Sequence, residues 1–411
     1  TEYIHINGMS FMISRNYLSC RSCDKLIIAR IQVGYEATQP HTFPCPHCDS
    51  IINIKLDLSQ PPRTLLEHDD TCEIVDHNGS EENGIIMNLG VGFTIPADMV
   101  HADMYSPAMA FMRDLQRIKG AAPTSISQSR SVFQIEGFPG SAGAWKHLEK
   151  ACRFHRKKNL NLREKHLEGY YEATSFPRLD FKDTVINFVR AFVGARARQG
   201  LEGLIEWKEE LQKKFDGEMK RYSSYHNNDV AKERFKEYLD VISTYFSAHH
   251  EYEQTITYAR FNSPIVVGTI ATSANFELTK MFYGSAFEMY GNHFDLLAAL
   301  NNISHDRPYD QLLNISLAKY RQTDKSKRPD CLKGTGGLDF FYEEYDSSLR
   351  NASHHRWIRI SDDRRTIEYR NGGSGEKRVL SYAEYTFRCN KLFIQLLVLF
   401  AFEIEFFGLL G

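Results

Sequence analysis

The sequence has little of three things that would assign it to a broad class. Positive charge is not in excess, because 50 Lys and Arg residues meet 52 Asp and Glu residues for a net charge of −2, so any nucleic-acid surface must be local. Long apolar runs are missing: residues 392–402, the most apolar segment, are too few to span a bilayer and predict a buried helix. Residues 1–10 lack a charged start followed by an apolar run, so we expect neither a signal peptide nor a membrane partner.

Cysteine is also scarce, with eight residues in the chain. Four of them form two pairs of the CxxC type, Cys20-Arg-Ser-Cys23 and Cys45-Pro-His-Cys48. That pattern suits one metal site in a reducing compartment better than a secreted disulfide scaffold, so we predict a cytoplasmic protein. The other four have no ligand-like spacing and are expected to be buried thiols: Cys72, Cys152, Cys331 and Cys389.

The spacing of the two pairs predicts a zinc site. They are separated by the 21 residues 24–44, and two CxxC turns can supply the four thiolates of a zinc tetrahedron. Residues 15–50 as a whole resemble a zinc ribbon, a module that often contacts nucleic acid or other proteins. A catalytic zinc needs an open position for water or substrate, so four thiolates favour one structural zinc per chain. His47, inside the second pair, is expected to face solvent.

The 411 residues are 42% hydrophobic and 12% aromatic, which is enough for two or three domains with real cores. β-branched runs at residues 27–33 and 51–56 predict strands beside the cysteine pairs, and residues 85–95 are a further strand candidate. Helical periodicity dominates from about residue 180. It predicts helices over residues 181–193, 230–246, 273–301 (as one helix or two), 309–320 and 338–349.

We therefore predict a mainly α protein in three regions. Residues 1–60 form a small β zinc ribbon, residues 61–228 a middle region that is mixed and then helical, and residues 229–411 a helical domain. The middle region contains a basic segment, residues 145–168, which suits either an RNA-binding surface or an ordinary charged helix.

The most informative stretch is Leu349-Arg-Asn-Ala-Ser-His-His-Arg-Trp357. Asn351 directly follows Arg350, and four residues separate Arg350 from His355. A predicted helix precedes the stretch, and a charged hairpin over residues 357–380 and an apolar helix over residues 383–402 follow it. This arrangement resembles the HEPN superfamily, whose motif is an arginine, often a polar residue next, and a histidine after four to six intervening positions. The resemblance covers roughly residues 230–411.

The resemblance implies a HEPN-like helical domain with a β-hairpin insertion, acting as a metal-independent RNA endonuclease. It also implies a composite site in a homodimer and a product with a 2′,3′-cyclic phosphate. Histidine exchanges protons near neutral pH, and the fixed donor fork of arginine suits phosphate oxygens. His355 is thus expected to transfer the proton, Arg350 to stabilise the phosphate charge, and Asn351 to orient the histidine or donate to the phosphate.

Two assignments within this site stay open. The family spacing favours His355 as the catalytic histidine, whereas helical periodicity places His354 on the face of Arg350. Such sites often have a supporting acidic residue on an earlier helix, for which both Glu288 and Asp295 are candidates.

The biological role also has alternatives. HEPN domains with accessory modules often act in toxin or antiphage abortive-infection systems, where RNA cleavage stops the host cell. A nucleic-acid-binding regulator with an inert HEPN-like domain, or a protein-binding scaffold, would use the same modules. Residues 350–391 carry ten Lys or Arg against five Asp or Glu, which suits either a bound phosphate backbone or a solvated hairpin.

Overall fold

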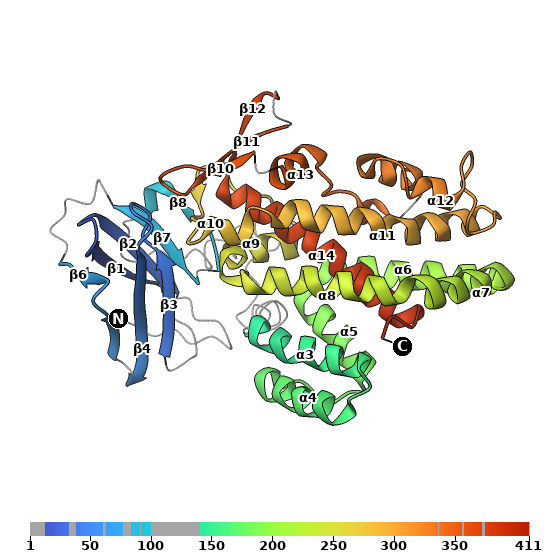
Figure 1. Cartoon of the computed structure of the whole chain (residues 1–411), viewed down its shortest axis with the longest axis horizontal. Coiled ribbons are helices and arrows are strands. Elements are labelled where there is room, and N and C mark those ends of the chain that lie inside the picture. Colours follow the sequence, from blue (N-terminus) through green and yellow to red (C-terminus); the bar gives the residue numbers. More distant parts are fainter. Residues whose placement is uncertain are drawn as a thin grey trace, which may run out of the picture.

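The fold is mainly helical, with a small β region at the N-terminal side. The computed structural model describes residues 13–32, 38–60, 63–76, 84–90, 92–99, 140–335, 337–355, 357–371 and 375–410. The strands of residues 13–96 lie at one end of the elongated molecule, and the helices, with a hairpin over residues 358–381 that projects from them, make up the rest (Figure 1). Parts of the predicted zinc ribbon and of the predicted middle region, residues 1–12 and 100–139 among them, lie outside the described residues.

Two sheets make up most of the β region. One has the strand order β6-β1-β2-β7 and the other β3-β4-β5. Their strands are β1 (Ile13–Cys20), β2 (Leu26–Gln32), β3 (Thr38–Pro44), β4 (Ile51–Gln60), β5 (Arg63–His68), β6 (Cys72–Ile74) and β7 (Ile85–Leu89). Their apolar side chains share one core that includes Leu18, Ile27, Phe43, Ile52 and Met87. Strands are therefore present at the predicted 27–33 and 51–56, whereas the candidate 85–95 forms a strand over residues 85–89 and then only at Ile95, in β8 (Ile95–Pro96). Strands on both sides of residue 60 share each sheet.

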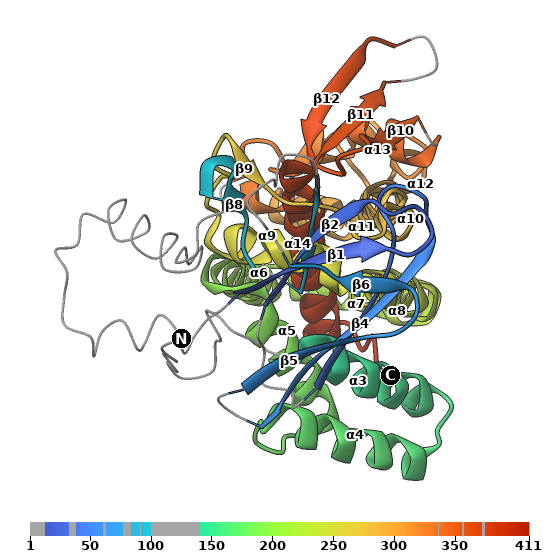
Figure 2. The ribbon, with the colours of Figure 1, turned by 90° about the vertical axis from the view of Figure 1, so that its left-hand side faces the viewer.

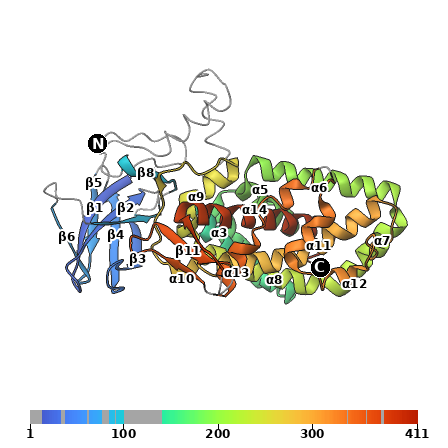
Figure 3. The same cartoon turned by 90° about the horizontal axis from the view of Figure 1, so that it is seen from above.

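The helical part is organised around one central helix, α14 (Tyr382–Phe406). Every residue from Leu392 to Ile404 is buried, so the buried helix predicted for residues 392–402 is confirmed. Views along two further directions show α14 surrounded by other helices (Figures 2 and 3). Those that pack on it are α5 (Phe181–Val193), α6 (Ala195–Lys214), α8 (Ala231–Ser247), α9 (His249–Phe261) and α11 (Phe282–Ser304). None of the helices in the described part of the chain combines the length and apolarity that a membrane span requires.

Several predicted elements are confirmed. The helix over residues 181–193 is α5, that over 230–246 is α8, and the stretch 273–301 forms two helices, α10 (Phe276–Thr279) and α11. The predicted hairpin forms a three-stranded sheet of β10 (Ile358–Ile360), β11 (Thr366–Arg370) and β12 (Lys377–Ser381). The helices α3 (Ser141–Arg156), α4 (Leu160–Thr174) and α7 (Asp216–Tyr225) complete this part, and buried residues on both sides of residue 228 share one core.

Two predicted helices are wrong. Residues 309–320 form only the short helix α12 (Leu317–Tyr320), because Leu312 and Leu317 donate their N–H groups to Ile315 and Asp310 within a tight loop. Residues 338–349 contain a 3-10 turn, η5 (Asp339–Phe341), then irregular chain, and only the last three residues are helical, as the start of α13 (Ser347–His354). Here aromatic residues leave helical spacing to reach the core: the Tyr345 ring stacks on Phe287 of α11 with centroids 3.8 Å apart.

A buried polar network ties α14 to its neighbours. The Glu403 carboxylate, fully buried on α14, accepts hydrogen bonds from the Arg234 guanidinium (3.0 Å) and the Tyr238 hydroxyl (2.8 Å) of α8. It also contacts Nε2 of His226 at 2.9 Å. Burial raises the pKa of Glu403, but Arg234 and His226 outweigh it and hold that pKa well below its usual range. Arg234 also pairs with Asp295 of α11, so three helices meet at one guanidinium.

Replacing the central guanidinium should destabilise the fold strongly. We expect Arg234→Met to lower the free energy of unfolding by about 3–5 kcal/mol, because Glu403 and Asp295 would stay buried without their shared cation. Urea unfolding followed by circular dichroism measures the change. The matched control is Arg178→Met, which breaks an exposed pair with Glu168 and should shift the transition little.

Equal transitions for the two variants would contradict this role of Arg234.

The network also predicts that the stability of the fold depends on pH. Because the pKa of Glu403 is lower in the folded state, its stabilising contribution is present above the unfolded value of about 4.3 and is lost as the pH falls towards the folded value. The Arg234→Met variant should lose less stability than the parent over that acidic range.

Candidate active site and metal centre

The motif residues lie on α13 (Ser347–His354), a short helix packed against α11. Asp346 caps its first turn by accepting hydrogen bonds from the N–H groups of Ser348 (2.7 Å) and Leu349 (3.2 Å). The Ser353 hydroxyl accepts from the N–H of Gly284 on α11 at 3.1 Å. A Cβ at Gly284 would lie 3.1 Å from both this hydroxyl and the His354 nitrogen, so the close approach of the two helices favours glycine there.

Arg350 is held by a carboxylate of α11. Its Nε and one terminal nitrogen both contact the Glu288 carboxylate, and the Lys325 ammonium lies 2.5 Å from the same group. All three side chains are about three-quarters buried. Burial raises the pKa of Glu288, but Lys325 and Arg350 outweigh it and keep the pKa below its usual value. The cluster thus holds two cations and one ionised carboxylate, with one net positive charge.

This contact distinguishes the two acidic candidates on α11. Glu288 meets Arg350, whereas Asp295 joins the buried network, where Arg321 Nε also binds it at 2.6 Å. Lys325 was missed from the sequence, because the polar stretch in which it lies offers no pattern that distinguishes it from other loop lysines. It belongs to η4 (Lys325–Leu332), a 3-10 segment that packs along α11.

Asn351 joins the motif to the hairpin. Its side-chain oxygen accepts a hydrogen bond from Arg350 at 2.7 Å, and its side-chain nitrogen donates to the Asn371 side-chain oxygen at 3.2 Å. Asn371 directly follows β11, so the hairpin fixes one side of the Asn351 amide. The sequence signalled the hairpin but not this contact.

His355 lies just beyond the end of α13 and is exposed. Its backbone N–H donates to the Asn351 carbonyl at 3.0 Å, and its ring stacks on Trp357 with centroids 5.0 Å apart and planes at 30°. His354 is also exposed, and its ring meets that of His355 edge-on at 5.8 Å. Within the described part of the chain, neither imidazole has a hydrogen-bond partner. The structure therefore brings Arg350 and Asn351 into one cluster and leaves both histidines facing solvent beside it.

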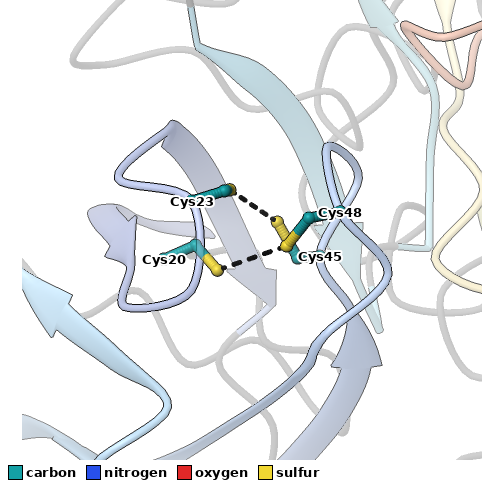
Figure 4. Close-up of side chains that lie close together, drawn as sticks. All are labelled: Cys20, Cys23, Cys45 and Cys48. Atoms are coloured by element: carbon teal, nitrogen blue, oxygen red, sulfur yellow. Dashed lines mark hydrogen bonds between the residues drawn. The ribbon is translucent and has the colours of Figure 1, made fainter.

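The four paired cysteines converge on one another from the turns that follow β1 and β3 (Figure 4). Their sulfur atoms all lie within 4.8 Å of one another, with Cys20 3.8 Å from Cys48 and Cys23 3.8 Å from Cys45. Zinc–thiolate bonds of about 2.3 Å in a tetrahedron place neighbouring sulfurs about 3.8 Å apart, so these cysteines fit one metal ion such as zinc.

The two cysteine turns have the same backbone design. In each, the residue after the second cysteine donates its N–H to the carbonyl of the first cysteine: Asp24 to Cys20 at 2.8 Å, and Asp49 to Cys45 at 2.9 Å. Both aspartates have positive φ, at 53° and 61°, a conformation that Asp adopts more readily than most residues. Each turn thereby directs two sulfurs to one point.

Among the described residues, the group of possible metal ligands consists of these four cysteines alone. His47 is exposed, as expected, and its Nε2 lies 3.1 Å from the Leu26 carbonyl. Burial raises the pKa of Cys45 to about 12, whereas hydrogen bonds with Ser50 lower that of Cys48 to about 6. A bound metal would keep all four as thiolates.

The remaining cysteines behave as isolated thiols. Cys72, Cys152 and Cys389 are buried, and burial raises the pKa of each. Cys331 departs from the expectation because it is only partly buried, with its sulfur 3.6 Å from the Tyr320 hydroxyl.

The basic segment predicted at residues 145–168 covers α3 and α4. Trp145 is 2% exposed and packs in the core, so it cannot stack on a base at the surface. Arg153 pairs with Glu149 and Asp240, and Arg163 with Glu164. These contacts favour an ordinary charged helix pair over an RNA-binding surface.

No protein-family description matches the chain, and no curated protein or solved structure was found to be similar to it. What the two sites can do is therefore argued from their own geometry.

The cysteine site should carry one tightly held metal ion per chain. We expect elemental analysis of the purified protein to find about one equivalent, and Cys45→Ser to lose it together with the ordered fold of the β region, because metal binding stabilises such small modules. Cys72→Ser, which changes a neighbouring buried thiol, is the control and should keep the metal. A disulfide among the four cysteines, or a metal-free parent protein, would contradict the site.

Proposed function

We propose that the protein is a metal-independent RNA endonuclease of the HEPN type. The observation that carries the proposal is the cluster of Arg350, Glu288 and Lys325, which presents a net positive charge beside two exposed histidines at the C-terminal end of α13. Arginine held by a carboxylate has a defined orientation, and an exposed imidazole can exchange protons with a substrate. The combination suits phosphoryl transfer on RNA.

The proposed reaction uses the 2′-OH of RNA as the nucleophile. His355 removes the 2′-OH proton, the 2′-oxygen attacks the adjacent phosphorus, and the bond to the 5′-oxygen breaks. The leaving oxygen takes up a proton, so the products are a 2′,3′-cyclic phosphate and a 5′-OH. Arg350 stabilises the extra negative charge on the phosphorane, and Asn351 orients the histidine or donates to the phosphate. Lys325 supplies a second positive charge that stabilises the negative charge on the phosphorane.

The site is proposed to be composite, with two chains of a homodimer placing their α13 helices face to face. Its composite nature accounts for histidines that lack partners within the described part of one chain. The α14 residues from Leu392 to Ile404 are buried inside the chain, so the proposed dimer contact uses the surface around α13 instead.

The proposed cysteine-bound metal is zinc with a structural role, because four thiolates complete its coordination. The proposed setting is the cytoplasm, where the enzyme would act as a toxin or antiphage effector by cutting cellular RNA.

The catalytic assignment predicts the effects of four substitutions. His355→Ala should reduce RNA cleavage by about 10²–10⁴-fold, because general acid–base catalysis contributes about that much. Arg350→Ala should be similarly damaging, and Arg350→Lys should not restore full activity because an ammonium lacks the planar fork. His354→Ala is the matched control and should retain most activity. Cleavage of a labelled RNA in excess chelator measures all four.

The outcomes separate the alternatives. An inactive His354→Ala beside an active His355→Ala would move the proton-transfer role to His354. Three alanine variants as active as the parent would remove the motif from the mechanism. A parent protein that binds RNA without cutting it would support the inert-domain regulator, and one that does neither would support the scaffold.

A composite site also predicts concentration dependence. Light scattering at micromolar concentration should give a homodimer, and specific activity should fall when dilution dissociates it. Full activity from a monomer at micromolar concentration would rule out the composite site.

A further inference from the structure

The hairpin that follows the motif has two different faces. Along its strands the side chains alternate, so Ile358 and Ile367 are buried while Arg359, Arg370 and Lys377 are exposed. The hairpin projects from the helical body directly beyond α13 (Figures 1 and 2). Its outward face is therefore a free surface next to the candidate active site.

The outward face carries an aromatic residue and a row of cations. Arg370 donates its backbone N–H to the Trp357 carbonyl at 3.2 Å and is the cross-strand partner of Lys377. The adjacent row is Arg359, Glu368 and Val379 in register across the three strands. Three cations thus face one carboxylate beside Trp357.

This charge arrangement costs stability in the protein alone. Like charges directly opposite each other on neighbouring strands are destabilising, and Arg370 and Lys377 form such a pair. Of these two cations only Lys377 has a carboxylate partner, Glu368, at 2.6 Å. Among the described residues no carboxylate pairs with the Arg359 or Arg370 guanidinium. An anionic ligand would relieve the repulsion.

Trp357 is placed to stack with a flat ligand. It is 38% exposed, whereas Trp145 is 2% exposed in the core. Its backbone is fixed on both sides, since its N–H donates to the Ala352 carbonyl at 2.9 Å and its carbonyl accepts from Arg370. The ring lies against His355, so a base stacked on Trp357 would hold its own sugar and phosphate close to the proposed proton-transfer group.

We propose that the outward face of the hairpin is a binding platform for single-stranded RNA. One base stacks on Trp357, and the adjoining phosphates pair with Arg370, Lys377 and Arg359. The strand is single because the faces of bases inside a duplex are covered by their neighbours. The platform rests on the proposed RNA endonuclease function and adds to it the substrate class and the residues that deliver the strand to the site.

The test measures binding without cleavage. The probe is a fluorescent oligonucleotide of 2′-O-methyl ribonucleotides, which has no free 2′-OH and cannot be cut, and the protein is the full chain. We expect Trp357→Ala to weaken binding at least about tenfold, and Trp357→Phe to keep most of the affinity, because any aromatic ring can stack. Arg370→Gln should weaken binding and lower the salt dependence by about one counterion.

Arg178→Gln, which changes an exposed, paired arginine on the loop after α4, is the matched control for charge and should leave binding unchanged. Thermal melting of each variant confirms that it folds. A double-stranded probe should bind more weakly than the single strand.

Trp357→Ala binding as tightly as the parent would overturn the platform, even if the parent cuts RNA. Equal affinity for double-stranded RNA would overturn it as well. A change in oligomeric state with unaltered RNA affinity would assign the face to self-association instead. Conversely, a parent that binds through Trp357 but never cuts unmodified RNA would keep the platform and defeat the endonuclease proposal.

Discussion

The burial of α14 is the constraint on which the rest of the helical part depends. From Leu392 to Ile404 the helix has no exposed side, so other elements must cover it all round, and most buried polar groups need a hydrogen-bond partner. The side-chain oxygen of Asn390 accepts a hydrogen bond from the Tyr245 hydroxyl at 2.7 Å, and its side-chain nitrogen donates one to the Tyr252 carbonyl at 2.9 Å. Together with the network at Glu403, these contacts fix where α8, α9 and α11 can lie.

Once α11 is fixed, its outer side presents two carboxylates two turns apart. Asp295 binds Arg234 in the interior and Arg321 at the edge, while Glu288 binds Arg350 and Lys325. Arg321 and Lys325 come from one stretch of chain that follows α11 back along its length. The same helix therefore contributes to the buried network through Asp295 and positions the candidate active site through Glu288.

The hairpin connects the two candidate sites. At its β10–β11 turn, Arg364 contacts the Asp49 carboxylate beside the second cysteine pair at 3.3 Å, and its carbonyl accepts the Ser273 N–H at 3.1 Å. At its other end, Asn371 contacts Asn351. The cysteine module thus adjoins the element that borders the motif, which would give a metal bound there a physical connection to the candidate active site.

The sequence by itself determined those features that depend on local pattern. Cysteine spacing predicted the four-sulfur cluster, and apolar periodicity predicted α5, α8 and α11. The most apolar run predicted α14, and a charged segment with a glycine-rich turn predicted the hairpin, because such signals lie within a few neighbouring residues. It also singled out Arg350, Asn351 and His355, although the roles of these residues stay a prediction. The three-way division of the chain stays a prediction too.

Tertiary structure alone decided the rest. Glu288 and Asp295 are equivalent by sequence, and only the packing of α13 on α11 separates them. Lys325 reaches the motif through Glu288, which is 37 residues away along the chain, and Asn371 contacts Asn351, which is 20 residues away. No local pattern encodes either contact. The helix expected over residues 338–349 was lost for the same reason: its aromatic side chains are stabilised more by burial against α11 than by helical hydrogen bonds, and burial depends on a partner that the segment itself does not contain.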